Sequence, residues 1–302
     1  MEKRLQAALS WSRHANYPAR LTALEEPMLV LGRSVFAIAT IGFGALSIIY
    51  RDFVHNLQPV DLLLPASTVG YVPLAILSGA FLIACGTLIF LQIRSAHAAM
   101  ALAIFFAIWV VFLQLPTAFL YPRLLRSPWW VRTFEVVAMT GTALIIGGLA
   151  SRPVRDQWIA RGRVLFGLSL PVFGVLHLVY GPGTASLIPA FYPFPLFLAY
   201  FTGTAKIAAG LAIASGRLVR VAAMLTALQY AVYTLTLHLP RQFIGRPPDA
   251  QRAGSTSLFV AVAFCGAALV VAGTLQNRAR DRAREHARED ARERAMAHPT
   301  TS

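Results

Sequence analysis

Long uninterrupted apolar runs are the feature of this sequence that most limits its fold. The hydrocarbon core of a bilayer is about 30 Å thick, and a helix needs roughly 20 apolar residues to cross it. Backbone amides in lipid must be hydrogen-bonded within their own segment, so such runs fold as helices. We predict an all-α integral membrane protein with eight transmembrane helices, at 30–50, 71–93, 98–121, 133–150, 164–180, 194–215, 219–239 and 255–275.

The composition excludes a soluble alternative. Hydrophobic residues make up 57% of the 302 residues and charged residues only 13%, whereas soluble domains carry about 25% charged residues. The net charge of +14 is the kind of excess that nucleic-acid-binding proteins carry. Here, however, the basic residues lie mostly between the apolar runs, which is typical of membrane topology. We therefore predict the lipid bilayer as the partner, and no nucleic acid.

The distribution of basic residues also predicts the orientation. With the N-terminus inside, 19 of the 27 Lys and Arg residues fall on the inner side, 7 fall outside, and Lys206 lies within a span. Cytoplasmic loops of membrane proteins carry the excess of Lys and Arg. The sequence thus predicts a multi-pass protein of the inner (plasma) membrane with both termini in the cytoplasm.

Two charged segments flank the predicted spans, a cytoplasmic N-terminal segment at 1–29 and a cytoplasmic tail at 277–302. The tail alternates arginine with acidic residues at helical spacing, for example Glu285 with Arg288 and Asp290 with Arg294. Such pairs stabilise a helix, and the tail lacks the apolar seam of a coiled coil. We predict a solvated helical extension of the last span.

The two halves of the chain resemble each other, which predicts a tandem duplication. Each half has four predicted spans, and an even number gives both halves the same orientation in the membrane. We therefore expect two parallel four-helix repeats, at 30–150 and 151–276, packed as bundles side by side. The matched residues are Gly32-Arg33 with Gly162-Arg163, Phe43-Gly44 with Phe173-Gly174 and Pro59 with Pro189 at a shift of 130; Gly79 with Gly203 and Leu115-Pro116 with Leu239-Pro240 at a shift of 124; and Gly141 with Gly266 at a shift of 125.

The second half carries a pattern that resembles a known family. The segments GVLHLVYGPGTASLIP and YFTGTAKIAAGLAIASGRLVRVAAMLTALQYAVYTLTLH, within 162–240, are similar to the DoxX family of four-helix membrane proteins. Residues 32–120 share the resemblance through the duplication. Where the family pattern has Glu in its second helix, this chain has Lys206. The first half has Leu82 at the position of Lys206 and Ser47 at that of His177, so a site at these positions is expected in the second half only.

Lys206 is the most unusual residue of the predicted spans. An ionisable side chain in hydrocarbon costs at least about 2.5–3.5 kcal/mol. Tyr200, Gly203 and Gly210 follow the same helical stripe, and small residues mark close contacts between membrane helices. We therefore predict that Lys206 points into the second repeat rather than to lipid, within reach of Tyr200, His177 or a polar group on the seventh span.

Further polar side chains lie toward the outer ends of neighbouring spans. His177 lies near the end of the fifth span, and His238 ends the seventh, with Tyr230 on the same helical face. Glu135, close to the outer end of the fourth span, is a secondary candidate. The sequence contains no metal-ligand spacing such as HxxxH or ExxH and no catalytic constellation, so we predict no catalytic residue and no metal. The predicted ligand-binding pocket consists of His177, Tyr200, Lys206, Tyr230 and His238.

Three functions are compatible with these sequence features. The DoxX resemblance implies a non-catalytic membrane subunit or accessory of a quinone- or thiol-linked redox system, with a redox partner protein and at most an accessory role in an oxidoreductase. A quinone suits such a pocket because His, Lys and Tyr donate hydrogen bonds to its carbonyl oxygens. Parallel repeats and a lysine near the membrane midplane are equally features of small-solute transporters or exporters. The absence of a catalytic constellation favours a structural membrane protein.

Overall fold

The computed structural model describes residues 27–120 and 129–297, with side chains described up to Thr274 in the last helix. Within these ranges every regular element is helical and no strand occurs, which agrees with the predicted all-α class. Most of the predicted segment 1–29 lies outside the described residues. The helices are α3 Pro27–Tyr50, α4 Tyr71–Phe90, α5 Ser95–Ile108, α6 Leu115–Leu120, α7 Trp129–Ala150, α8 Asp156–Val179, α9 Gly181–Ala185, α10 Pro195–Ser215, α11 Val219–Tyr233 and α12 Pro248–Ala297. Two π-helical turns, η2 Trp109–Gln114 and η4 Thr234–His238, follow α5 and α11, and the 3₁₀ turns η1 Val60–Leu62 and η5 Pro240–Gln242 lie in loops.

Seven helices in the described ranges are long and apolar enough to cross a membrane. They are α3, α4, the continuous helix Ser95–Thr117, α7, α8, α10 and the part of α12 at Pro248–Thr274. The chain is therefore a multi-pass helical membrane protein. The predicted seventh span at 219–239 is helical but divided, because α11 has 15 residues and the 5-residue π turn η4 continues it. A crossing by this segment, and hence a total of eight, stays a prediction.

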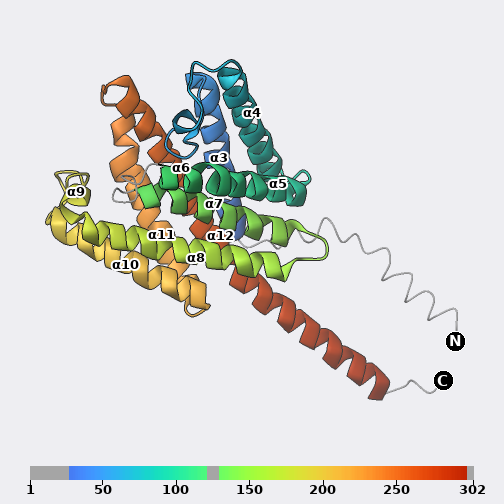
Figure 1. Cartoon of the computed structure of the whole chain (residues 1–302). Coiled ribbons are helices and arrows are strands. Elements are labelled where there is room, and N and C mark those ends of the chain that lie inside the picture. The colour runs from blue at the N-terminus through green and yellow to red at the C-terminus, as the bar shows by residue number, and fades with distance from the viewer. Residues whose placement is uncertain (1–26, 121–128, 298–302) are drawn as a thin grey trace.

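The last helix is longer than its predicted span. α12 runs for 50 residues from Pro248 to Ala297. It passes without a break across the expected boundary at 276 and into the charged tail, as the helical spacing of the tail predicts. Figure 1 shows its C-terminal half projecting away from the other helices.

The helices form two sets that cross in Figure 1. α3, α4, α11 and α12 run down the view, whereas α5, α7, α8 and α10 run across it. Within these sets α3 packs on α12, and α8 packs on α7. Each set therefore combines helices from both halves of the chain. The halves meet where α3 packs on α12 and α7 on α8, whereas α3–α4–α5–α7 and α8–α10–α11–α12 are joined by contacts within one half. The expected pair of four-helix bundles stays a prediction. Hydrophobic periodicity marks the buried face of a helix but not the partner that covers it, so the sequence did not reveal which helices join the halves.

Glycines bring these helix pairs into backbone contact. A Cβ atom added at Gly266 of α12 would lie 2.7 Å from the carbonyl oxygen of Gly32 in α3, and one added at Gly141 of α7 would lie 2.5 Å from that of Gly162 in α8. The pairs Gly44–Gly79 and Gly174–Gly203 join α3 to α4 and α8 to α10 in the same way. Such close approach is typical of membrane helices packed through small residues. All four pairs consist of residues that the sequence comparison of the two halves had matched.

Irregular backbone also recurs at matched positions. The turns after α4 and α10 have left-handed residues at Gln92 and Arg94 and at Gly216 and Leu218, again 124 residues apart. The π turns η2 and η4 end at Gln114 and His238, with the same separation. Because π-helical turns are rare, two of them at one matched position indicate that the halves have a common local geometry.

The helices enclose two lobes that share α7 and α12. In the first lobe α3, α4 and α5 complete a ring with these two helices, and in the second lobe α8, α10 and α11 do so. The segment between α3 and α4 folds into the first lobe, where Val54 and Leu57 are 1% and 0% exposed. Leu187, which matches Leu57 at a shift of 130, is 50% exposed. The segment after α3 therefore buries its side chains in the first lobe, whereas the matching residue of the second lobe is half exposed.

Candidate functional site

The second lobe contains a cavity of about 670 Å³. Residues of α7, α8, α10, α11 and α12 line it, together with the segment that follows α8. Most of its wall is apolar, with polar side chains at a few places, which is typical of sites that bind small organic ligands. Five of the six residues singled out in the sequence line it, namely Glu135, His177, Lys206, Tyr230 and His238.

Lys206 points into this lobe, as its position predicted. Lys206 is 2% exposed, and its Nζ donates a hydrogen bond to the Tyr233 hydroxyl oxygen at 3.1 Å. Nζ also lies 4.6 Å from the centre of the Tyr233 ring and 5.4 Å from that of Tyr230. The predicted polar partner on the seventh helical segment is thus Tyr233, while Tyr200 takes no part.

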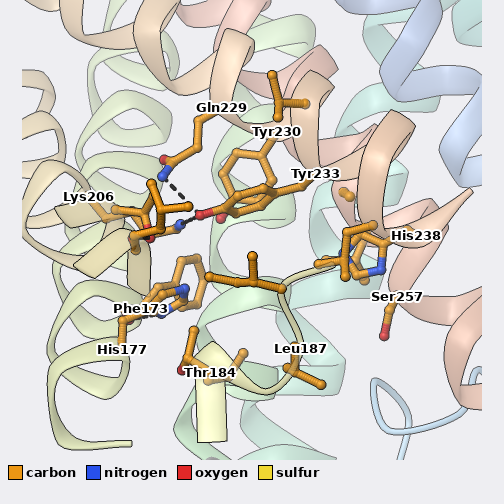
Figure 2. Close-up of a pocket in the computed structure, with 18 of the residues that line it drawn as sticks. Phe173, His177, Thr184, Leu187, Lys206, Gln229, Tyr230, Tyr233, His238 and Ser257 are labelled. Atoms are coloured by element: carbon orange, nitrogen blue, oxygen red, sulfur yellow. Dashed lines mark hydrogen bonds between the residues drawn. The ribbon is translucent and has the colours of Figure 1, made fainter. Parts of the chain in front are cut away.

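The hydrogen bonds of Tyr233 and Lys206 leave donors free for a ligand at this end of the cavity. The Tyr233 hydroxyl oxygen accepts from Lys206 and, at 3.0 Å, from Nε2 of Gln229 (Figure 2). With both lone pairs engaged, the hydroxyl proton of Tyr233 is directed elsewhere as a donor. An ammonium has three donors, and Lys206 uses one of them here. Among the described side chains no carboxylate pairs with Lys206, since the ion pairs found there are Arg132–Glu135 and Arg252–Asp52.

His177 lies beside Phe173 at the same end of the cavity (Figure 2). Its Nδ1 is 2.7 Å from the carbonyl oxygen of Phe173. A carbonyl only accepts, so Nδ1 carries a proton, and Nε2 of the neutral ring is left as an acceptor. The site thus combines two donors on α10 and α11 with an acceptor on α8.

The opposite end of the cavity carries His238 and Ser257, which Figure 2 shows away from Lys206. Glu135 lines the cavity from α7 and pairs with Arg132 at 3.3 Å. Tyr230 is 8% exposed, and its ring packs 4.8 Å from that of Phe264 in α12. Arg132 and Glu135 on α7 pair with each other, so of the two described Lys and Arg residues that line the cavity, Lys206 has no described acidic partner.

Tyr200 lies outside the site. It is 38% exposed, and its ring contacts Gly181 at the start of α9. The buried stripe of α10 runs through Ala199, Gly203, Lys206, Gly210 and Ile213, so it contains the expected Gly203, Lys206 and Gly210 but has Ala199 in place of Tyr200. One residue is about 100° of rotation on a helix, which is enough to turn Tyr200 to the outside.

Sequence reasoning missed Tyr233 and Gln229, which hold the Lys206 end of the site. The sequence could have predicted Tyr233 as a residue of the site, because it follows Tyr230 by three residues and so shares its helical face. Gln229 precedes Tyr230 directly, and helical periodicity does not place neighbours on one face. The hydrogen bond from Gln229 exists because Gln229 and Tyr233 are four residues apart on α11.

The first lobe has an apolar set at the matching positions. Leu82 replaces Lys206, Phe106 replaces Tyr230 and Trp109 replaces Tyr233, and each of these three is at most 1% exposed. Phe106 and Trp109 make an edge-on ring contact at 5.0 Å, as Tyr230 and Tyr233 do at 5.8 Å. The same architecture therefore packs with leucine where the second lobe has lysine.

The chemistry available at this site is hydrogen bonding to a lipophilic molecule. Among the described residues no group of three His, Cys, Asp or Glu side chains could hold a metal ion. The donors of Lys206 and Tyr233 fit a carbonyl oxygen, and the apolar wall fits a ring or hydrocarbon tail. Comparisons with protein-family models, with curated proteins and with solved structures find no match for this chain.

Proposed function

We propose that the chain is a DoxX-like membrane protein that binds a quinone in its second lobe. In this role it is the non-catalytic membrane subunit or accessory of a quinone- or thiol-linked redox system. One observation carries the proposal: a lysine amine and a tyrosine hydroxyl lie together at the buried end of an apolar cavity. A quinone carbonyl accepts from both donors, and its tail and ring replace water along the apolar wall.

The first lobe supports a ligand role for Lys206. Leu82 occupies the matching place at 0% exposure, so the packing of these helices does not require a charge there. Burying a charge without an acidic partner is costly, and ionisable residues within membrane segments are most often functional. A ligand that accepts hydrogen bonds from Lys206 offsets part of that cost.

The role we propose needs no chemistry from the protein itself. The ligand carries the electrons, and a redox partner protein supplies or removes them. The chain holds the head group by hydrogen bonds and surrounds it with Leu198, Leu237 and other apolar side chains. This role agrees with a cavity whose polar groups are few and in which Lys206, Gln229 and Tyr233 form one hydrogen-bonded cluster.

We also propose that 30–150 and 151–276 arose by tandem duplication. The four glycine contacts, the left-handed turn residues and the two π turns support it, since each recurs at a matched position. In this proposal the first lobe lost, or never had, the polar side chains that line the cavity of the second lobe.

A small-solute transporter is the second candidate. The exposed fractions of two cavity-lining residues favour it, because Leu187 is 50% and Val232 37% exposed, so the cavity reaches the surface. A transporter alternately opens one site to the two sides of the membrane. Uptake or efflux that depends on this chain, without any bound quinone, would favour this candidate over the first.

The topology that we propose has eight crossings and both termini in the cytoplasm. Because the two helix sets are inclined to each other in Figure 1, reporter fusions provide the decisive test. Fusions at residues 65, 125, 185 and 248 should report the outer side, and those at 96, 156 and 218 the cytoplasm. A reporter at the C-terminus that reads external would contradict the even number of crossings.

Native purification tests the ligand. We expect the full chain, extracted in mild detergent, to retain a quinone that organic extraction and mass spectrometry identify. The control is a membrane protein of similar size purified in the same way, since free quinone partitions into any micelle. Quinone at the control level, with no redox protein co-purifying, would overturn the proposed function.

A further inference from the structure

His238 is a polar residue of the cavity that the proposed contact at Lys206 leaves unused. It lies at the end of η4 and lines the cavity away from Lys206 (Figure 2). No described residue forms a hydrogen bond with its ring, although its backbone carbonyl accepts from Gln242 at 3.1 Å. Both ring nitrogens are therefore free to bind a molecule in the cavity.

The first lobe shows what the matching position binds. Gln114, which matches His238 at a shift of 124, ends the π turn η2 and is 0% exposed. Its Nε2 donates to the carbonyl oxygen of Leu57 at 2.8 Å and to that of Asn56 at 3.3 Å. The side chain of Leu57 meanwhile fills the lobe at 0% exposure. The occupant of the first lobe thus offers an apolar body and carbonyl oxygens to this position.

The last residue of each π turn faces the interior of its lobe, since Gln114 is buried and His238 lines the cavity. A π turn contains an extra residue relative to an α-helical turn, so it rotates the residues that follow it. Gln114 and His238 stand at the same point of their turns. In the second lobe the corresponding chain segment lines the cavity, where Leu187 is half exposed and its carbonyl oxygen accepts from Arg241 at 2.8 Å. The space before His238 is left to a ligand.

We infer that His238 binds a second acceptor atom of the ligand, so that the cavity holds the molecule at both ends. Lys206 and Tyr233 bind one oxygen, and His238 binds another across a rigid apolar body. The ligand class is a flat ring with an acceptor oxygen at each end, as in a 1,4-quinone, rather than a lipid with a single head group. This inference rests on the proposed function and specifies its ligand.

Binding of two probes to the full chain in detergent tests the inference. The first probe is a fully substituted 1,4-benzoquinone with a ten-carbon tail, whose substituted ring resists addition of the Lys206 amine. The second is an aryl ketone with the same tail and one carbonyl. We expect the wild type to bind the quinone about fivefold more tightly than the ketone, since one hydrogen bond contributes about 1 kcal/mol.

Two substitutions of His238 separate the outcomes. His238→Leu should weaken quinone binding about fivefold and leave ketone binding unchanged, because it removes one hydrogen bond. His238→Gln, which installs the residue of the first lobe, should keep the preference for the quinone. Melting temperatures of both variants check folding, and the wild-type preference tests the inference even if His238→Leu does not fold.

The binding results distinguish failure of the two-ended site from failure of the proposed function. Equal affinity of the wild type for both probes, or a His238→Leu variant that keeps the preference, would overturn the two-ended site while the proposed function stands. If the wild type binds neither probe, the proposed function itself fails.

Discussion

Replacing Lys206 with leucine should lower quinone affinity by about 100-fold without unfolding the protein. A hydrogen bond from a charged donor contributes about 1.5–3 kcal/mol, which corresponds to roughly 10- to 100-fold in affinity. The fold should tolerate leucine because Leu82 fills the matching place in the first lobe at 0% exposure. An apolar residue in place of a buried charge is often neutral or stabilising by about 1–4 kcal/mol, so the melting temperature should hold or rise.

Leu82→Lys is the matched control for this substitution. It places an amine among Phe106 and Trp109, which carry no acceptor oxygen, in a lobe already filled by Leu57. An uncompensated buried charge costs about 3–5 kcal/mol, so this variant should lose most of its stability. Thermal unfolding in detergent, with quinone binding by titration, measures both effects. A Lys206→Leu protein that unfolds, beside a stable Leu82→Lys protein, would show that Lys206 serves the fold and not a ligand.

Gly266→Leu should destabilise the protein by about 3 kcal/mol, the upper end of the usual cost of overpacking. A Cβ atom at this position lies 2.5 Å from the backbone nitrogen of Phe36 and 2.7 Å from the carbonyl oxygen of Gly32. Both are backbone atoms of α3, so no side-chain rotation relieves the clash. α3 and α12 would have to separate, and they belong to different halves of the chain.

Gly245→Leu is the control, because nothing lies within 4 Å of a Cβ atom there. Its melting temperature should stay near that of the wild type, whereas that of Gly266→Leu should fall sharply. Gly141→Leu should behave like Gly266→Leu, since its Cβ meets the carbonyl oxygen of Gly162 in α8. Similar melting of Gly266→Leu and Gly245→Leu would exclude the packing of α3 on α12.

The hydropathy of the chain was enough to predict its class. Burial of backbone polar groups in lipid leaves the helix as the solution for a long apolar run, and seven such helices occur in the described ranges. The inward orientation of Lys206 was predictable for a similar reason, because small residues beside it mark the helix face that meets other helices. The residues that match between the halves likewise predicted which glycines recur, and those glycines lie at the helix contacts.

The pairing of helices and the composition of the site depended on the tertiary structure. A periodic pattern identifies a buried face but carries no information on the helix that covers it, so the packing of α3 on α12 and of α8 on α7 was not foreseen. A shift of one residue turns a helical side chain by about 100°, which placed Tyr200 outside. Leu57 lies in the first lobe beside Gln114, a contact between residues distant in sequence. By itself the sequence determined what lies in the membrane and which face of each helix is buried, because solvation acts on each residue locally. Only the tertiary structure decided which lobe is filled and which is open, because that depends on how separate segments meet.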